Sequence, residues 1–328
     1  MKISTIWTTL LLVCCLACSL EAQKLEWVKP SLPSLPPARS DSSMAYDADT
    51  LSMVLFGGGI NNDAMVFGDT WLFTWPTGWS QLSPATSPPP RSGAGFAYDP
   101  ITKTAVLFGG NPTNGVYLND TWTWDGTTWT QQFPPLSPPA RSFNSEQMAF
   151  DVATGTVVLF GGAGPGSVFG DTWVWHGEAK IWTQEFPATS PSPRITTLTY
   201  DRATDEIIIF GGENEGPNFF DDTWTWNGVT WTQRFPATSP PARTNSSLAY
   251  DAYIGEVVLF GGYNYIGGQA LNDTWTWNGT TWSQVQTPFT PRGRYGAAME
   301  YDPSLEGLVL FGGYFTDGPW INQTWLFF

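Results

Sequence analysis

The chain has 328 residues, and its 14 Lys and Arg against 29 Asp and Glu give a formal net charge of -15. Such a charge argues against binding of nucleic acid, because phosphate recognition needs a basic surface. Aromatic residues make up 16% of the chain and charged residues only 13%. This composition favours an all-β protein, since aromatic side chains pack well on pleated sheets.

Residues 1–22 are typical of a secretory signal peptide. A lysine precedes an apolar run from Ile6 to Leu20, and small residues stand near its end. That run is too short to predict a membrane span, and we expect cleavage after Ala22. The protein is therefore expected to be secreted or held at the cell surface. Lipid attachment at Cys18 is an alternative, although Cys15 stands where such signals usually carry Leu.

The three cysteines of the chain, at positions 14, 15 and 18, all lie in this first segment. The expected mature chain, residues 23–328, therefore has no disulfide, thiol nucleophile or sulfur ligand. Its stability must come from packing, which one continuous core of about 300 residues can supply.

Residues 23–328 repeat one pattern six times. Each unit starts near an Arg that follows prolines, and these arginines are Arg39, Arg91, Arg141, Arg194, Arg243 and Arg294. Each unit also contains Phe-Gly-Gly at the end of an apolar run. The arginines lie 49 to 53 residues apart. A regular period of this length is the signature of a repeat architecture.

Each unit divides into four expected strands. A strand rich in small residues ends in Tyr-Asp or Phe-Asp, and an Asp-led turn joins it to the apolar strand before Gly-Gly. A variable loop leads to "DTWTW", and an Asn-Gly or Asp-Gly turn then predicts a hairpin into "TWTQ". Four antiparallel strands repeated six times predict a six-bladed β-propeller. An open solenoid is the alternative, but it would need capping units.

The two ends of the chain complement each other. In five units the fourth-strand Trp precedes the next Arg by twelve residues, and Trp27 stands twelve residues before Arg39. The last unit stops three residues after Trp325 and lacks a fourth strand of its own. We therefore expect residues 24–30 to form the outer strand of the last blade. This pairing would close the ring and remove its exposed edges.

The Gly-Gly after an apolar strand, the downstream Trp and the period of about 50 residues resemble kelch repeats, as in the galactose oxidase central domain. The resemblance covers residues 24–328. It implies the fold but not one function, because such propellers serve as enzymes, adaptors and binding platforms. Galactose oxidase-like chemistry needs two His and a Tyr cross-linked to Cys, whereas this chain has His176 alone. We expect no catalytic residue, no metal and no cofactor.

Repeated polar residues suggest both structural and binding roles. An Asp before Thr-Trp recurs in five units, with Gln323 in the sixth, and a second Asp ends each first strand. We expect both sets to be structural, since a repeated residue needs a repeated explanation. The resemblance implies that the six arginines lie on a ligand-binding rim, where they could recognise carboxylates or sulfates. The alternative is that each pairs with an Asp or caps carbonyl groups of a neighbouring blade.

The variable loops break the symmetry, and function in repeat proteins concentrates there. The candidate binding residues are Tyr263, Tyr265, Tyr314, Phe315 and Trp320. They suit stacking on sugars or a protein hot spot, and they suit equally a cover over the core. Asn-x-Ser/Thr sequons, which predict glycosylation in a eukaryotic host, stand at Asn119, Asn245, Asn272, Asn278 and Asn322.

The sequence thus predicts a secreted, monomeric binding module for an extracellular glycan or an acidic protein segment, held at the arginine-lined rim. One alternative is a carbohydrate-active enzyme that uses carboxylates and Arg of the pore, similar to bacterial kelch-type sugar epimerases and mutarotases. The other alternative is a structural surface protein.

Overall fold

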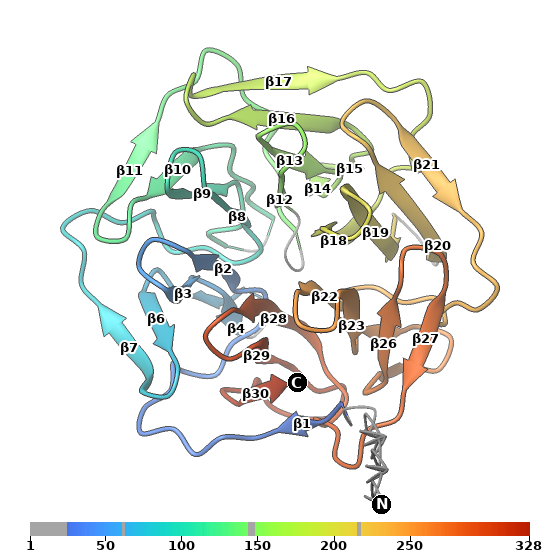
Figure 1. Cartoon of the computed structure of the whole chain (residues 1–328). Coiled ribbons are helices and arrows are strands. Elements are labelled where there is room, and N and C mark those ends of the chain that lie inside the picture. Colours follow the sequence, from blue (N-terminus) through green and yellow to red (C-terminus); the bar gives the residue numbers. More distant parts are fainter. Residues whose placement is uncertain (1–24, 61–62, 114, 144–147, 215–217) are drawn as a thin grey trace, which may run out of the picture.

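A computed structural model describes residues 25–60, 63–113, 115–143, 148–214 and 218–328. The expected signal peptide lies outside them. Six four-stranded antiparallel sheets surround a central axis as the blades of a propeller (Figure 1). The predicted six-bladed all-β fold is confirmed. Within the described ranges there is no helix long and apolar enough to cross a membrane.

The strands of each blade follow one another outward from the axis. The innermost strands are β2 (Ser43–Asp47), β8 (Gly95–Asp99), β12 (Met148–Asp151), β18 (Ile195–Asp201), β22 (Ser247–Asp251) and β28 (Tyr295–Asp302). The second strands are β3 (Ser52–Phe56), β9 (Thr104–Phe108), β13 (Thr156–Phe160), β19 (Glu206–Glu213), β23 (Glu256–Phe260) and β29 (Gly307–Tyr314).

The outer half of each blade carries the repeated tryptophans. The third strands are β6 (Thr70–Thr74), β10 (Thr121–Trp124), β16 (Thr172–His176), β20 (Phe219–Trp226), β26 (Thr274–Trp277) and β30 (Thr324–Phe327). The outermost strands are β7 (Gly78–Leu82), β11 (Trp129–Gln132), β17 (Ile181–Glu185), β21 (Trp231–Arg234), β27 (Trp282–Val285) and β1 (Trp27–Val28). Short hairpins extend three of the loops after Gly-Gly, and they pair β4 (Gly59–Ile60) with β5 (Met65–Val66), β14 (Ala163–Gly164) with β15 (Ser167–Val168), and β24 (Tyr263–Asn264) with β25 (Gln269–Ala270).

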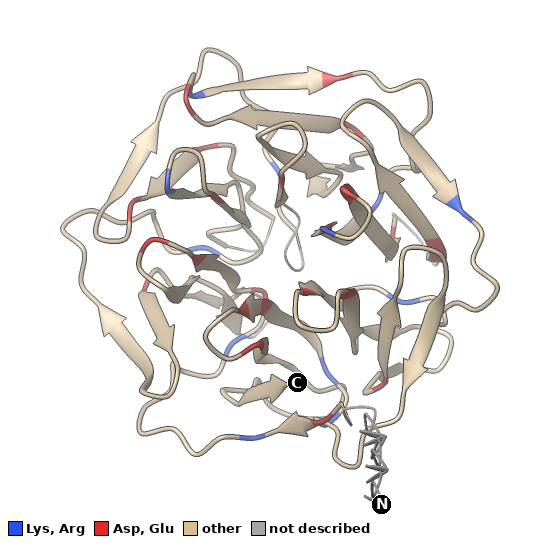
Figure 2. Cartoon of the chain, in the orientation of Figure 1, with Lys and Arg blue, Asp and Glu red and all other residues tan. Residues whose placement is uncertain are grey.

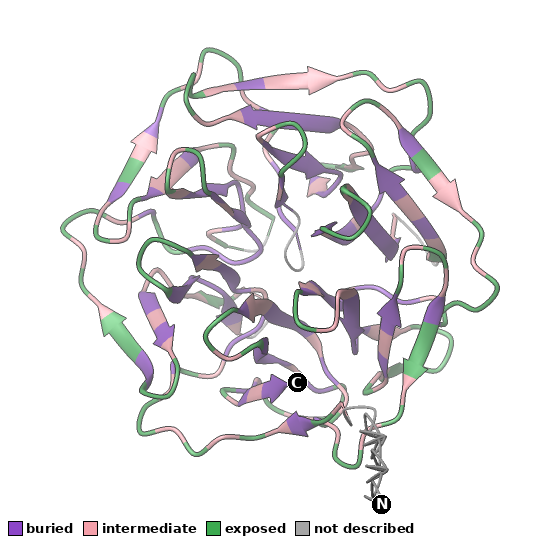
Figure 3. Ribbon diagram, viewed as in Figure 1, coloured by how far each residue is buried: buried purple, intermediate pink, exposed green. Residues whose placement is uncertain are grey.

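The core lies mainly along the second strands. Every residue of β3 and β13 is buried, as expected for an apolar strand covered on both faces. Figure 3 shows this burial along the inner strands, with exposure concentrated in turns and outer strands. The repeated Asp that ends each first strand holds the following turn. For example, the Asp47 carboxylate accepts hydrogen bonds from the N–H groups of Asp49 and Thr50.

The two chain ends close the ring within one blade. Strand β1 pairs antiparallel with β30, with Trp27 opposite Phe327 and Val28 opposite Leu326. The last sheet therefore has the order β1-β30-β29-β28, and Figure 1 shows β1 beside the red strands. The predicted closure is confirmed.

One contact joins each blade to the blade before it. The outermost Trp buries its ring beside the Phe of the preceding Phe-Gly-Gly, and its Nε1 donates a hydrogen bond to the first Thr of the preceding third strand. The six Trp–Thr bonds are all 2.9 Å long, and they join Trp79 to Thr324, Trp129 to Thr70, Trp182 to Thr121, Trp231 to Thr172, Trp282 to Thr223, and Trp27 to Thr274. The corresponding ring contacts also recur at all six junctions.

Replacing Trp27 by Ala should destabilise the whole protein. Trp27 is 1% exposed, contacts Phe260 and Phe327, and supplies the contact that closes the ring. We expect a loss of roughly 3–5 kcal/mol in the free energy of unfolding, typical of a buried aromatic truncated to Ala. Chemical denaturation measures it. Phe235→Ala, at a side chain 85% exposed, is the control and should change stability little. Equal stability of the two variants would contradict the closure role.

Candidate functional site

The six repeated arginines form a buried belt, which we call the arginine belt. All six are at most 1% exposed. In five blades two guanidinium nitrogens donate to both oxygens of the Asp before Thr-Trp, at 2.5 to 3.1 Å. The arginine of each blade also donates to the carbonyl of the first glycine of Gly-Gly, as Arg91 does to Gly109 at 2.9 Å. Figure 2 shows Lys and Arg spread around the ring rather than gathered on one blade.

The belt also explains the Gly-Gly motif. The second glycine donates its N–H to the carbonyl of the next arginine along the chain, as Gly58 does to Arg91 at 2.9 Å. A Cβ on Gly57 would lie 2.4 Å from that same carbonyl oxygen, and its φ of +68° is one that side chains disfavour. The close approach of neighbouring blades therefore requires glycine there.

Blade six departs from this pattern. Gln323 replaces the Asp and accepts one hydrogen bond from Arg294, at 3.2 Å. Burial without a facing carboxylate lowers the pKa of Arg294 to about 9. In four of the other blades, the desolvated carboxylates of Asp69, Asp120, Asp171 and Asp273 keep pKa values below the usual range, because the arginine hydrogen bonds and charge outweigh the desolvation.

The placement of the arginines corrects their expected role in ligand binding. Asp in five blades, Gln323 in the sixth and backbone carbonyls in all six accept hydrogen bonds from the guanidinium groups, and the side chains are enclosed. Phe315 is also structural. It is 8% exposed, and the guanidinium carbons of Arg292 and Arg294 lie 4.3 and 5.6 Å from its ring centroid. Phe67, Phe169 and Phe220 cover the belt in the same way in other blades.

The other predicted aromatics meet in one continuous chain of rings, which we call the aromatic band. Successive ring centroids lie 4.8 to 6.1 Å apart, in the order Phe219, Tyr265, Tyr263, Tyr295, Tyr314, Trp320. The band crosses blades four, five and six on the side of the loops that follow Gly-Gly. Tyr265 is 60% exposed and the adjacent Ile266 92%. A backbone hydrogen bond from Ala270 to the Thr316 hydroxyl, at 2.6 Å, joins the loops of blades five and six.

Two members of the band were missed from the sequence. Tyr295 directly follows a belt arginine, where other units carry Ser, Thr or Ile, so comparison of that repeat position could have found it. It lies between Tyr263 and Tyr314 and joins their rings. Phe219 stacks nearly parallel on Tyr265, with an interplanar angle of 12°. Nothing in its own repeat position indicates this, because the contact depends on the fold of the Tyr265 loop.

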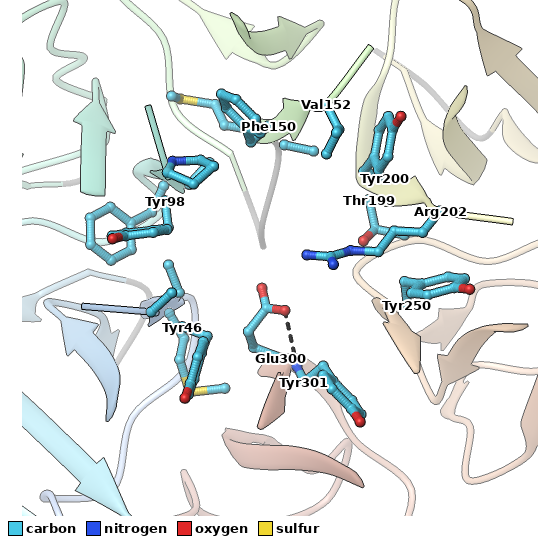
Figure 4. Close-up of a pocket in the computed structure, with 18 of the residues that line it drawn as sticks. Tyr46, Tyr98, Phe150, Val152, Thr199, Tyr200, Arg202, Tyr250, Glu300 and Tyr301 are labelled. Carbon is cyan, nitrogen blue, oxygen red and sulfur yellow. Dashed lines mark hydrogen bonds between the residues drawn. The ribbon is translucent and has the colours of Figure 1, made fainter. Parts of the chain in front are cut away.

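A second candidate site lies on the axis. The inner strands enclose a cavity of about 440 Å³, which we call the axial cavity. Its wall repeats the residue before the turn Asp, and these residues are Tyr46, Tyr98, Phe150, Tyr200, Tyr250 and Tyr301 (Figure 4). Glu300 and Arg202 also line it. Desolvation raises the pKa of the Glu300 carboxyl to about 7.

The remaining predicted residues lie apart from these sites. The sequon residues Asn119, Asn272, Asn278 and Asn322 are exposed, whereas Asn245 is half-buried. Their glycosylation stays a prediction. His176 contacts the Thr183 hydroxyl at 2.9 Å. In the part of the chain that the structure describes, no group of three or more His, Cys, Asp or Glu side chains could hold a metal ion.

Comparisons with known proteins agree with this architecture. The family model of the KLHDC2/KLHL20/DRC7 Kelch-repeats domain matches residues 52–199 and 152–327. The chain is 32% identical to an F-box/kelch-repeat protein of Arabidopsis thaliana, over 52% of this chain and 40% of that protein. It is 29% identical to acyl-CoA-binding domain-containing protein 4 of the same plant, over 70% and 35%. The chain thus spans less than half the length of these curated relatives.

The blade-six exception gives a paired test of the arginine belt. Asp120→Asn should lower the free energy of unfolding by roughly 2–3 kcal/mol, because it leaves a buried guanidinium without its counter-charge. Gln323→Asp should act in the opposite direction, since it supplies Arg294 with the carboxylate of the other blades. Denaturant titration of both variants checks this. Identical stability of both variants and the wild type would contradict a structural role.

Three carboxyl groups with raised pKa values should make the free energy of unfolding fall as pH rises. Desolvation raises the pKa of Asp41 to about 8, of Glu300 to about 7 and of Asp251 to about 6. Each group stays protonated in the folded chain at pH values where it ionises in the unfolded chain, so stability declines from about pH 4 to pH 8. Glu300→Gln should flatten this decline, measured as the melting temperature at pH 5 and pH 8. The exposed Glu306→Gln variant should retain the wild-type slope.

Proposed function

This chain belongs to the kelch-repeat family, and we propose that it acts as a protein-binding module whose contact surface is the aromatic band. The supporting observation is the row of six touching rings on blades four to six. The other blades carry small or polar residues at the equivalent positions of Tyr263, Tyr295 and Tyr314. If these aromatic side chains served only to cover the core, they would be expected in every blade and not on blades four to six alone.

The chemistry of the band suits a partner with apolar and aromatic groups. Tyrosine and tryptophan are enriched in binding hot spots, because they bury a large area at little conformational cost. Tyr265 and Ile266 are the exposed end of the band, at 60% and 92%. Trp320 is half-buried against Tyr314 at the other end. The band thus presents Tyr265 and Ile266 to a partner, while its other rings are packed against one another.

The enclosed arginine belt alters the expected nature of the partner. An acidic segment would need exposed cations, and Arg292, an exposed cation beside Phe315 and the band, is paired with Asp317. The net charge of -15 would also oppose an acidic partner. We therefore propose a protein segment with apolar anchors, outside the cell if the first 22 residues direct export. A glycan that stacks on Tyr265 is the second candidate, because sugar faces also pack on exposed aromatic rings.

Selection from a random linear peptide library tests the proposal. Peptides enriched on the wild-type protein should bind Tyr265→Ala at least about tenfold more weakly, as expected when a hot-spot anchor is removed. Trp320→Ala should act in the same direction. Fluorescence anisotropy measures each affinity.

Phe235→Ala provides the matched control, because Phe235 is an exposed aromatic residue in the loop after β21, outside the band. It should leave peptide affinity unchanged. Peptides that bind the Tyr265 and Phe235 variants equally well would refute the band as the contact surface. A glycan array probed with the same variants would then show whether the loss at Tyr265 concerns sugars instead.

A further inference from the structure

The axial cavity carries two side chains that break the sixfold pattern. Glu300 stands one residue before the wall tyrosine Tyr301, and four of the other blades carry Ala there while blade four carries Thr199. Arg202 directly follows a turn Asp, where the other units carry Ala, Pro or Val. Neither residue is explained by the repeat, because five blades build the same strand and turn without it. Each introduces a charge where its counterparts have none.

Both charged groups are directed into the cavity. Figure 4 shows the Glu300 carboxylate, on β28, and the Arg202 guanidinium, in the turn after β18, pointing toward the open centre. No ion pair joins them among the described residues, although the Arg202 charge is felt at Glu300. One carboxylate oxygen of Glu300 accepts the N–H of Tyr301 at 3.0 Å. The other oxygen faces the cavity without a hydrogen bond from the described residues.

Apart from Thr199, the rest of the wall is apolar or aromatic. Met44, Ala97, Met148, Leu198 and Leu248 line it together with the six wall aromatics. A pocket of this kind encloses the apolar part of a ligand, while a few polar groups of the protein fix the orientation of that ligand. A carboxylate beside aromatic rings favours an ammonium group, which also gains from the ring faces. The Arg202 guanidinium offers two parallel donors to a carboxylate.

We propose that the axial cavity binds a small zwitterionic ligand with an apolar side chain, whose ammonium group lies at Glu300 and whose carboxylate lies at Arg202. The ligand is an amino acid or a short peptide, since both carry these two charges on an apolar body. Desolvation raises the pKa of Glu300, which agrees with a carboxyl that no cation of the described residues contacts. The site is separate from the aromatic band, so the two proposals stand independently.

Isothermal titration of the wild-type protein with a matched ligand series tests the charges. L-phenylalanine carries both charges, phenethylamine lacks the carboxylate, and 3-phenylpropionate lacks the ammonium group. The dipeptide Phe-Phe tests the distance between the charges. We expect L-phenylalanine or Phe-Phe to bind at least about tenfold more tightly than either singly charged analogue, the difference that one charge-assisted contact makes.

Variants then assign each charge to its partner. In Glu300→Gln the zwitterion should lose its advantage over 3-phenylpropionate, and in Arg202→Met it should lose its advantage over phenethylamine. Glu306→Gln changes an exposed carboxylate outside the cavity lining and should bind as the wild type does. Tyr265→Ala, in the aromatic band, should likewise leave zwitterion affinity unchanged.

Three outcomes would overturn the proposal. The wild-type protein could bind none of the four probes, or it could bind them without regard to their charges. Glu300→Gln and Glu306→Gln could also bind the zwitterion equally well. The ligand series on the wild-type protein needs no variant to fold, and it therefore decides the matter even if a substitution destabilises the chain.

Discussion

The contact between each outermost Trp and the preceding blade is the interaction on which the structure depends. Its indole ring packs beside a Phe of the neighbour, and its Nε1 bonds to a Thr of the same neighbour. The contact recurs at every junction, including the junction made by Trp27. Because a blade cannot bury its two faces alone, each Trp supplies both apolar area and a satisfied polar group where blades meet.

The arginine belt acts at a second level, between the strands within a blade and between neighbouring blades. Each guanidinium bonds to the loop that follows the second strand, and so joins this loop to the start of the first strand. The backbone carbonyl of the same arginine accepts the N–H of a glycine in the previous blade. Buried charge of this kind is stable because the fork of Arg matches both oxygens of Asp. Blade six, with Gln323, uses one neutral contact instead. It is also the blade assembled from both ends of the chain.

The fold could be predicted almost fully from the sequence, whereas the candidate sites could be predicted only in part. The spacing from Trp27 to Arg39 matched the other five units, and this match alone indicated how the ring closes. The role of the arginines could not be predicted in the same way. A repeated Arg exposed on the rim and a repeated Arg buried below the rim give the same sequence pattern. Only burial distinguishes the two. Glu300 could not be singled out within its own strand, because the residues around it follow the repeat pattern. It stands out only when the equivalent positions of the other five blades, which carry no charge, are compared with it.

The pairing of β1 with β30 sets an order of events during synthesis. Trp27 and Phe327 stand 300 positions apart in the chain, so the first strand to emerge is among the last to find its partner. Blades one to five can assemble as they appear, each on the one before it, while the N-terminal strand waits unpaired. The final step then joins two remote segments at a considerable cost in chain entropy, and it can occur only after the last strand has been released. A chain interrupted before β30 would therefore carry an incomplete ring with two open edges, which quality control could recognise.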